Sequence, residues 1–412
     1  MASNEKNDTD PAGFSRRSLL MGATAMTAAG MVPKALAAAV EPQIGGGGVL
    51  AYAGCYTPNG GGIYQYRINL GTGALTQENL FTGIPNPSWI TFGLSGNYLY
   101  STNEIDTFDG TTSGSVSAFR INRATGALTP LNVVSSHGGA PVYLNPHPSG
   151  KFLFVANYDG GSIAVLPIRA DGSLGAATDV KLDTGNVGPT TPTGAPPGSF
   201  ANSGHDAPHA HFIHSDPSGR FVLHVDLGQD RIYSWRFNSV SGTLSPAAVP
   251  FTAVAPGAGP RHLAFHPSGR VVYAVTEESS VLLAYAYNGN TGALTLIQTL
   301  STLPAGFVGT SYGSEVALSG DGRFVYAANR LHDSIATFAV DSGGSLTLVG
   351  HTQTMGDYPR SFAIDPTGNF FYATNQRSDA IAIFKINRAT GEPAFTGQYV
   401  PIGSPARLAF LI

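Results

Sequence analysis

The sequence predicts an all-β protein, a seven-bladed β-propeller with four-stranded antiparallel blades. Two repeated patterns and the two ends of the chain predict it. A turn of the type HPSGRVVYAVTE recurs six times, centred on Gly96, Gly150, Gly219, Gly269, Gly322 and Gly368. A pattern of the type RATGALT recurs seven times, with Gly73, Gly126, Gly172, Gly242, Gly292, Gly344 and Gly391 spaced 46 to 70 residues apart. Repeats at this spacing are typical of propeller blades.

Each repeat divides into four short strands. In the first complete unit we expect strands at 87–95, 97–104, 114–121 and 127–135, each rich in β-branched or aromatic residues and bounded by turn residues. Polar and apolar residues alternate incompletely in the first two strands, as expected for sheets packed on both faces. We find no amphipathic helix of three turns.

The two ends of the chain complete each other. Residues 49–57 (VLAYAGCYT) have the pattern of a second strand with no first strand before it, and residues 404–412 (SPARLAFLI) have the pattern of a first strand. We therefore expect the C-terminal strand to pair with the N-terminal blade, because this closes the ring and covers two exposed sheet edges. Residues 49–412 then form one domain.

The composition limits the function. Of the 412 residues, 42% are hydrophobic and only 12% are charged, whereas glycine (52) and proline (28) are abundant, as hairpin-rich proteins require. The net charge of −4 argues against nucleic acid as a partner. A single cysteine, Cys55, excludes an intramolecular disulfide and a Cys-based zinc site. We interpret Cys55 as a packed thiol, since no histidine shares its strand.

The first 39 residues are interpreted as a twin-arginine export signal. SRRSLLM at 15–21 is followed by a weakly apolar, small-residue run and by KALAAA at 34–39, which offers cleavage sites at 37–39. An uncleaved membrane anchor is the alternative, but residues 19–32 are too short to span about 30 Å of hydrocarbon. We expect a flexible spacer at 40–48, the Tat translocase as partner during export, no stable membrane span after cleavage, and a periplasmic or secreted product.

One long insertion, residues 176–208, precedes the sequence PHAHFIH. It is rich in Gly, Pro, Ser and Thr. We expect a long loop, and loops of this length in compact domains are usually functional or mobile.

The repeats also predict where a site lies. The start of each first strand and the end of each second strand meet at the same mouth of the propeller, because the two strands are antiparallel. The positions at the start form a first ring, Ser88, Val142, His211, Arg261, Ser314, Arg360 and Ala406. Those at the end form a second ring, Glu104, Tyr158, Leu227, Glu277, Arg330, Gln376 and Tyr56. Positions that only build the scaffold carry similar residue types in every repeat. At the positions of these two rings, the residue type differs from one repeat to the next.

The charged members of the rings are the candidate catalytic residues: His211, Arg261, Glu277 and Arg360. Two guanidinium groups can grip an anionic substrate or stabilise an oxyanion. Glu277 or His211 is the candidate base, and pairing with Arg261 would lower the pKa of Glu277, whereas burial would raise it. The alternative is that the arginines only neutralise carboxylates that line the channel.

The candidate substrate-binding residues are His209, Glu104, Tyr158, Arg330 and Gln376, and Glu315 is a further carboxylate to consider. His209 and His211 share a face by strand alternation and could form a metal pair, whereas His214 points the other way. No Asp/Glu–His spacing accompanies that pair, so we predict no metal and no cofactor.

Six segments carry a family resemblance. They are NPSWI with TNE at 86–104, HPSGKFLFVANYDGGSIAVLPI at 147–168, PHAHFIHSDPSGRFVLHVDLGQDRIYSW at 208–235, GPRHLAFHPSGRVVYAVTEESS at 259–280, GRFVYAANRLHDSIATF at 322–338 and YPRSFAIDPTGNFFYATNQRSDAIAIF at 358–384. The chain resembles the seven-bladed propeller lactonases, which include bacterial 6-phosphogluconolactonases and 3-carboxy-cis,cis-muconate lactonising enzymes. The resemblance implies a site at His211, Arg261, Glu277 and Arg360. The chain departs from the family in SGDG at 319–322, in the long insertion and in the export signal.

Three functions follow as hypotheses. The first is hydrolysis of a sugar-acid lactone, a small-molecule substrate, to the free acid by water attack at the channel mouth. The second is a carboxymuconate-type cycloisomerase, in which the arginines hold carboxylates. The third is an exported, non-catalytic propeller that binds a carbohydrate or a protein through the same mouth.

Overall fold

The computed structural model describes residues 48–200 and 204–412. The predicted signal at 1–39, with its cleavage site, and the spacer up to residue 47 lie outside the described residues. Within the described ranges, no helix has the length and apolar character that a bilayer crossing requires. The one helical element found there is a 3₁₀ turn, η1 (Gln376–Ser378).

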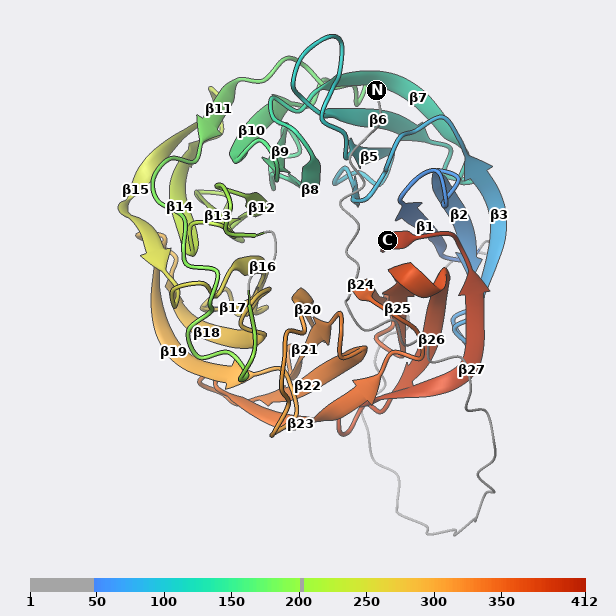
Figure 1. The fold of residues 1–412 in the computed structure, drawn as a ribbon. Helices are drawn as coiled ribbons and strands as arrows, with labels where there is room; N and C mark the ends of the chain where they lie inside the picture. The colour runs from blue at the N-terminus through green and yellow to red at the C-terminus, as the bar shows by residue number, and fades with distance from the viewer. Residues whose placement is uncertain (1–47, 201–203) are drawn as a thin grey trace. The chain divides into compact units, whose positions relative to one another are not determined.

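The described residues form seven four-stranded antiparallel sheets, which confirms the predicted fold class. Figure 1 shows the sheets arranged around a common centre. Blade 1 consists of β28 (Pro405–Leu411), β1 (Leu50–Cys55), β2 (Ile63–Ile68) and β3 (Leu75–Phe81). Blade 2 consists of β4 (Ile90–Phe92), β5 (Tyr98–Asn103), β6 (Ser115–Ile121) and β7 (Leu128–Ser135). Blade 3 consists of β8 (Pro141–Pro146), β9 (Phe152–Asn157), β10 (Ser162–Pro167) and β11 (Asp179–Leu182).

The remaining four blades follow the same order from the inside outward. Blade 4 is β12 (Ala210–Ser215), β13 (Phe221–Asp226), β14 (Arg231–Asn238) and β15 (Thr243–Ala253). Blade 5 is β16 (Pro260–Phe265), β17 (Val271–Thr276), β18 (Val281–Asn288) and β19 (Ala293–Ser301). Blade 6 is β20 (Gly313–Leu318), β21 (Phe324–Asn329), β22 (Ser334–Val340) and β23 (Leu346–Gln353). Blade 7 is β24 (Pro359–Ile364), β25 (Phe370–Asn375), β26 (Ala380–Ile386) and β27 (Pro393–Pro401).

The C-terminal strand closes the ring as predicted. β28 pairs antiparallel with β1, from Leu50 opposite Leu411 to Cys55 opposite Pro405. The innermost strands β4, β8, β12, β16, β20, β24 and β28 each contact the next, and β28 contacts β4. The last strand of the chain therefore supplies the inner edge of a blade whose other three strands come from the start of the domain.

The insertion at 176–208 is only partly a loop. Its residues 179–182 form β11, which pairs with β10 and completes blade 3, so the expectation of a loop throughout was wrong there. Backbone hydrogen bonds also join the insertion to other blades. The backbone N–H of Gly188 donates to the carbonyl of Gly228, at 2.8 Å, and the N–H of Gly309 donates to the carbonyl of Pro197, at 2.8 Å. The described part of the insertion thus reaches the loop that precedes blade 6.

A hydrogen bond to a glycine carbonyl joins every pair of neighbouring blades. The acceptors are the seven repeat glycines of the outer hairpins, Gly73, Gly126, Gly172, Gly242, Gly292, Gly344 and Gly391. The donors lie on the preceding blades, at 2.6 to 3.1 Å, and are the hydroxyl groups of Tyr52, Tyr100, Thr178, Ser234, Tyr273, Tyr326 and Tyr372. All seven glycines have positive φ, between 70° and 89°, which favours glycine. The repeat pattern therefore marks the junctions between blades.

The innermost strands begin with an irregularity that shapes the centre. In β12, β16 and β24 one extra residue interrupts the pairing with the next strand: His211, Arg261 and Arg360, respectively. A residue in the left-handed region precedes the strand in blades 5 and 7, Gly259 with φ 64° and Tyr358 with φ 63°. β-Bulges bend a strand and re-aim its side chains. The bulge therefore allows two successive residues, such as Arg261 and His262, to line the same central pocket.

Tyr326→Phe tests the junction between blades 6 and 7. The hydroxyl of buried Tyr326 donates to the carbonyl of Gly391 at 2.8 Å, so its removal leaves a buried acceptor without a partner. We expect the free energy of unfolding, measured by urea denaturation, to fall by about 1–2 kcal/mol. Tyr399→Phe is the matched control, because Tyr399 is 48% exposed, and we expect no change. Equal losses in the two variants would contradict a role for the junction.

Candidate active site

A pocket lies where the innermost strands begin, at the predicted mouth. Its empty volume is about 240 Å³, including the open entrance. Six of the seven first-ring positions line it, namely Ser88, Val142, His211, Arg261, Arg360 and Ala406. Tyr56 and Glu104 of the second ring line it as well, together with Trp89, His262 and Ser361. The structure thus brings His211, Arg261 and Arg360 into one pocket.

Glu277, at the end of β17, is bound by two arginines. Its Oε2 lies 2.9 Å from Nε of Arg261 and 2.6 Å from Nη2 of Arg330. Burial would raise the pKa of Glu277, but the charges of Arg330 and Arg261 outweigh it and hold the pKa below its usual value. The same two contacts fix both guanidinium groups. The carboxylate is therefore an anchor for the arginines and a weak base.

Arg261 is buried, and its contacts fix one side of its guanidinium group. Nε donates to Glu277, and Nη1 donates to the backbone carbonyl of Ser314. Burial lowers the pKa of Arg261 to about 10, with a further contribution from the positive charge of Arg330. The group remains a cation at neutral pH.

Arg360 is held more loosely. Its guanidinium lies over the ring of Tyr56, 4.9 Å from the ring centroid, and Nη2 is 4.0 Å from Oε1 of Glu104. Glu104 in turn accepts a hydrogen bond of 2.8 Å from the hydroxyl of Tyr56. Since no closer ion pair immobilises it among the described residues, Arg360 can reorient toward a bound group.

His211 is buried and neutral. Burial lowers its pKa well below the usual value, and the positive charges of Arg261 and Arg360 lower it further. Its Nδ1 is buried and has no hydrogen-bond partner within the described residues. An imidazole with a free ring nitrogen beside two guanidinium groups can accept a proton from a molecule bound in the pocket.

Four of the five residues predicted to bind substrate lie outside this pocket. His209 is stacked on Tyr158, with ring centroids 4.0 Å apart, and its ring nitrogens face Asp206 Oδ1 at 2.8 Å and the Tyr158 carbonyl at 3.0 Å. Arg330 forms an ion pair with Glu277 and does not line the pocket, and Gln376 is the first residue of η1. Only Glu104 is part of the lining.

Sequence reasoning missed His262, Trp89 and Arg407. His262 lies beside Arg261, and its Nδ1 is 2.9 Å from Oε1 of Glu315. Arg407 lies 4.2 Å from the centroid of the Trp89 ring. Each of them directly follows a first-ring position. If side chains alternated regularly along the strand, as we assumed, these residues would point away from the pocket. The residue type at these positions differs between repeats, from Trp to His to Arg, and this difference could have indicated that they belong to the site.

Within the described residues, no group of three His, Cys, Asp or Glu side chains is arranged to hold a metal ion. The buried thiol of Cys55 lies 2.9 Å from the carbonyl of Gly62, and burial raises its pKa to about 11. A thiol in this state is a poor nucleophile.

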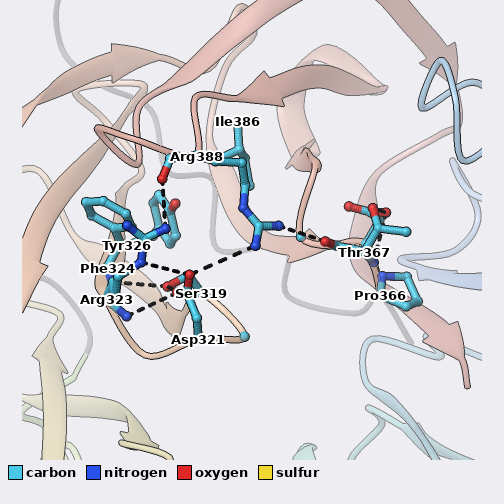
Figure 2. Close-up of a pocket in the computed structure, with 12 residues that line it drawn as sticks. Ser319, Asp321, Arg323, Phe324, Tyr326, Pro366, Thr367, Ile386 and Arg388 are labelled. Carbon is cyan, nitrogen blue, oxygen red and sulfur yellow. Dashed lines mark hydrogen bonds and ion pairs between the residues drawn. The ribbon is translucent and has the colours of Figure 1, made fainter. Parts of the chain in front are cut away.

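A second hollow, of about 780 Å³ including open solvent, lies at the other end of the strands, between blades 6 and 7 (Figure 2). Arg323 Nε is 2.9 Å from Asp321 Oδ2, and Arg388 Nη1 donates to the carbonyl of Thr367 at 2.8 Å. Nη2 of Arg323 donates to the carbonyl of Arg388, at 2.8 Å. These arginines join two blades, and none of the predicted site residues lies in this hollow.

Comparison with known proteins agrees with the fold. Residues 50–410 match the family model described as lactonase, 7-bladed beta-propeller. The chain is 34% identical to a 6-phosphogluconolactonase of Bacillus subtilis over 364 residues, which is 88% of this chain and 98% of the relative. It is 31% identical to a 6-phosphogluconolactonase of Formosa agariphila, over 76% of this chain and 86% of that one.

Solved structures extend the comparison. The structure of a periplasmic gluconolactonase from Pseudomonas aeruginosa superposes with a TM-score of 0.80 and 33% sequence identity, and covers 88% of this chain and 98% of that one. A match over nearly the whole described chain, in both sequence and structure, identifies the family. The chain belongs to the seven-bladed β-propeller lactonases.

Proposed function

We propose that the protein hydrolyses a lactone in the central pocket. The water oxygen bonds to the ring carbonyl carbon while His211 takes the water proton. The bond between that carbon and the ring oxygen then breaks, and the departing alkoxide takes the proton back from His211. The product is the free hydroxy acid. The observation that carries this proposal is the imidazole of His211, whose Nδ1 has no hydrogen-bond partner within the described residues, in a pocket shared with two guanidinium groups.

The structure favours His211 over Glu277 as the base. Glu277 is bound by Arg261 and Arg330, so taking up a proton would weaken two ion pairs. His211 has no such partner within the described residues, and its Nδ1 makes no hydrogen bond there. The low pKa of His211 makes it a weak base in the free enzyme, but the negative charge that develops on the substrate offsets the nearby arginines and strengthens it during the reaction.

The arginines supply the charge that an oxyanion requires. Arg261 is held in one orientation by Glu277 and by the carbonyl of Ser314, so it needs little reorganisation as charge develops. Arg360 is free enough to adjust to the shape of the substrate. Together they support binding of the carbonyl oxygen or of an anionic substituent on the lactone.

The substrate belongs to the sugar-acid lactones in this proposal. The named relatives are 6-phosphogluconolactonases and a gluconolactonase, which supports D-glucono-1,5-lactone and its 6-phospho form as the first substrates to test. Release of acid from either lactone, measured by pH-stat, supports hydrolysis. Turnover of a carboxymuconate in place of the lactones would favour the cycloisomerase. Tight binding without turnover would favour a binding protein.

We also propose that the chain is exported. The support is the SRRSLLM sequence at 15–21, followed by a short apolar run and small residues. A periplasmic or secreted location would expose the site to lactones outside the cytoplasm.

The pH dependence tests His211 as base. Only its neutral form can accept a proton, and its pKa lies well below 6.5. We expect kcat/KM to stay level as the pH falls from 7 through 6.5, and to decline only at lower pH as His211 becomes protonated. His211→Gln should lower kcat by about 10²–10⁴-fold and remove this acid limb. Initial rates, corrected for spontaneous hydrolysis, provide the measurement. An acid limb that persists in the variant would exclude His211 as the base.

Arg360→Met tests the loosely held arginine. We expect kcat/KM to fall by about 10²–10³-fold because a donor to the oxyanion is lost. The melting temperature should change little, since the only ion pair of Arg360 found within residues 48–200 and 204–412 is 4.0 Å long. Arg388→Met, in the hollow at the other end, is the matched control and should keep the activity. Equal activity in the two variants would remove Arg360 from the site.

Replacement of the paired arginines tests export. In cells that have the Tat pathway, we expect Arg16→Lys/Arg17→Lys to leave the protein, detected by immunoblot, in the cytoplasmic fraction with its signal uncleaved. Wild-type protein should appear in the periplasm or the medium at the cleaved size. A single Lys34→Arg change is the control. Normal export of the double variant would contradict the proposed signal.

A further inference from the structure

A further set of equivalent side chains adjoins the residues of the proposed active site. Its members are the residues that follow the first-ring positions, one from each blade: Trp89, Tyr143, Phe212, His262, Glu315, Ser361 and Arg407. We call this set the floor ring. Three of its members, Trp89, His262 and Ser361, line the pocket together with the first ring. The floor ring therefore lies next to the groups that would meet the substrate.

Contacts run around the floor ring without a break. On one side the ring centroids of Trp89 and Tyr143 are 4.2 Å apart, those of Tyr143 and Phe212 are 4.3 Å apart, and those of Phe212 and His262 are 5.5 Å apart. On the other side polar groups continue the circuit. Oε2 of Glu315 is 2.9 Å from Oγ of Ser361 and 3.1 Å from Nη1 of Arg407, whose guanidinium covers Trp89. His262 and Glu315 join the aromatic half to the polar half.

The contacts of Glu315 keep it ionised. Its two oxygens accept from Nδ1 of His262, Oγ of Ser361, Nη1 of Arg407 and the backbone N–H of Val316. Burial alone would raise the pKa of Glu315, but its partners, His262 first, lower it to about 2. An ionised carboxylate can only accept, so the proton in this contact sits on Nδ1 of His262.

The contact of the other ring nitrogen of His262 indicates the same tautomer. Nε2 of His262 lies 3.4 Å from Nη1 of Arg261, which can only donate. Nε2 must therefore carry the lone pair. Besides Glu315 and Arg261, the titratable groups that face His262 within the described residues are His211 and Tyr143, with ring centroids 5.1 Å and 5.2 Å away, and Arg407. Glu315 thus selects the form of His262 that can accept from Arg261.

The guanidinium of Arg261 is then held at two of its three nitrogens. Nε is bound by Glu277, while Nη1 meets the carbonyl of Ser314 and Nε2 of His262. Within the described residues, Nη2 donates no hydrogen bond that is found. Its two N–H groups are the donors that remain for a ligand.

We propose that His262 and Glu315 are positioning residues for lactone hydrolysis. Glu315 fixes the tautomer of His262, and His262 holds the guanidinium of Arg261 so that Nη2 is left for the oxyanion. Arg261 serves this purpose only if the hydrolysis proposed above takes place, so the positioning role rests on that function. The alternative is that His262 merely fills space among the rings of Trp89, Tyr143 and Phe212.

Three substitutions of His262 separate the two roles. Gln can place an acceptor where Nε2 was, Asn can replace only the donor at Nδ1, and Phe keeps the ring but no nitrogen. We expect His262→Gln to retain kcat/KM within about tenfold, and His262→Asn and His262→Phe to lose about 10²-fold, mainly in kcat, because the oxyanion forms only in the transition state. Glu315→Gln should lose a similar factor, because its amide can donate to Nδ1 and reverse the tautomer.

The outcomes distinguish the two proposals. Wild-type protein that hydrolyses neither gluconolactone nor its 6-phospho form would overturn both the function and the positioning role. Active wild-type protein with equal activities in the Gln, Asn and Phe variants would overturn the positioning role alone. His266→Gln and His266→Asn, at the opposite turn of the same blade, are controls and should keep full activity.

A spectroscopic measurement tests the tautomer without turnover. In ¹⁵N-histidine-labelled wild-type protein, we expect the ring signals of His262 to show a protonated Nδ1 and an unprotonated Nε2 at pH 7, assigned by their loss in His262→Gln. In Glu315→Gln the unprotonated signal should move to Nδ1. Protonation at Nε2 in the wild-type protein would overturn the inference, even if a variant failed to fold.

Discussion

The hydrogen bond from each blade to a glycine carbonyl of the next is the constraint on which the rest of the structure depends. Its seven copies set the spacing between neighbouring blades at their outer hairpins. One of them, from Tyr372 to Gly73, joins the last blade to the first at 2.7 Å. With the pairing of β28 and β1, it makes the ring a closed set of seven units. Closure brings the starts of seven strands to one axis, and no single blade could do this alone.

Charge is concentrated at that axis. The chain is only 12% charged, yet Arg261, Glu277, Glu315 and Arg330 are all buried around the centre. Desolvation of this many charges is unfavourable unless each has partners. An irregular register near the start of β8, β12, β16, β20, β24 and β28 helps to provide them, because it allows residues from two successive positions to line one pocket. The site and its supporting ring thus depend on a backbone feature that recurs in most blades.

The sequence predicted the fold, and it predicted that three of the candidate residues lie close together, because repeats report equivalent positions directly. Glycine spacing predicted seven blades, and the unmatched strands at the two ends predicted the closure. Equivalent positions predicted that His211, Arg261 and Arg360 lie together. The roles of Glu277 and His262 could not be predicted from the repeats. Whether Glu277 is a base or an anchor depends on Arg330, 53 residues away in the sequence. The bulge that turns His262 inward leaves no pattern in a strand of six residues.

In the proposed hydrolysis, the cluster of guanidinium groups would explain why a histidine with a depressed pKa can still serve as a base. In the free enzyme, burial and the positive charges of Arg261 and Arg360 keep His211 neutral. The same charges attract the carbonyl oxygen of a lactone. As negative charge develops on that oxygen, it offsets the positive charges of the arginines that had lowered the pKa of His211. The affinity of the imidazole for a proton then rises. In the proposed mechanism, the arginines would therefore act on the oxyanion directly and on the base indirectly. Removing either arginine would raise the pKa of His211 in the free enzyme. It would also reduce the rise in that pKa during the reaction, which drives proton transfer.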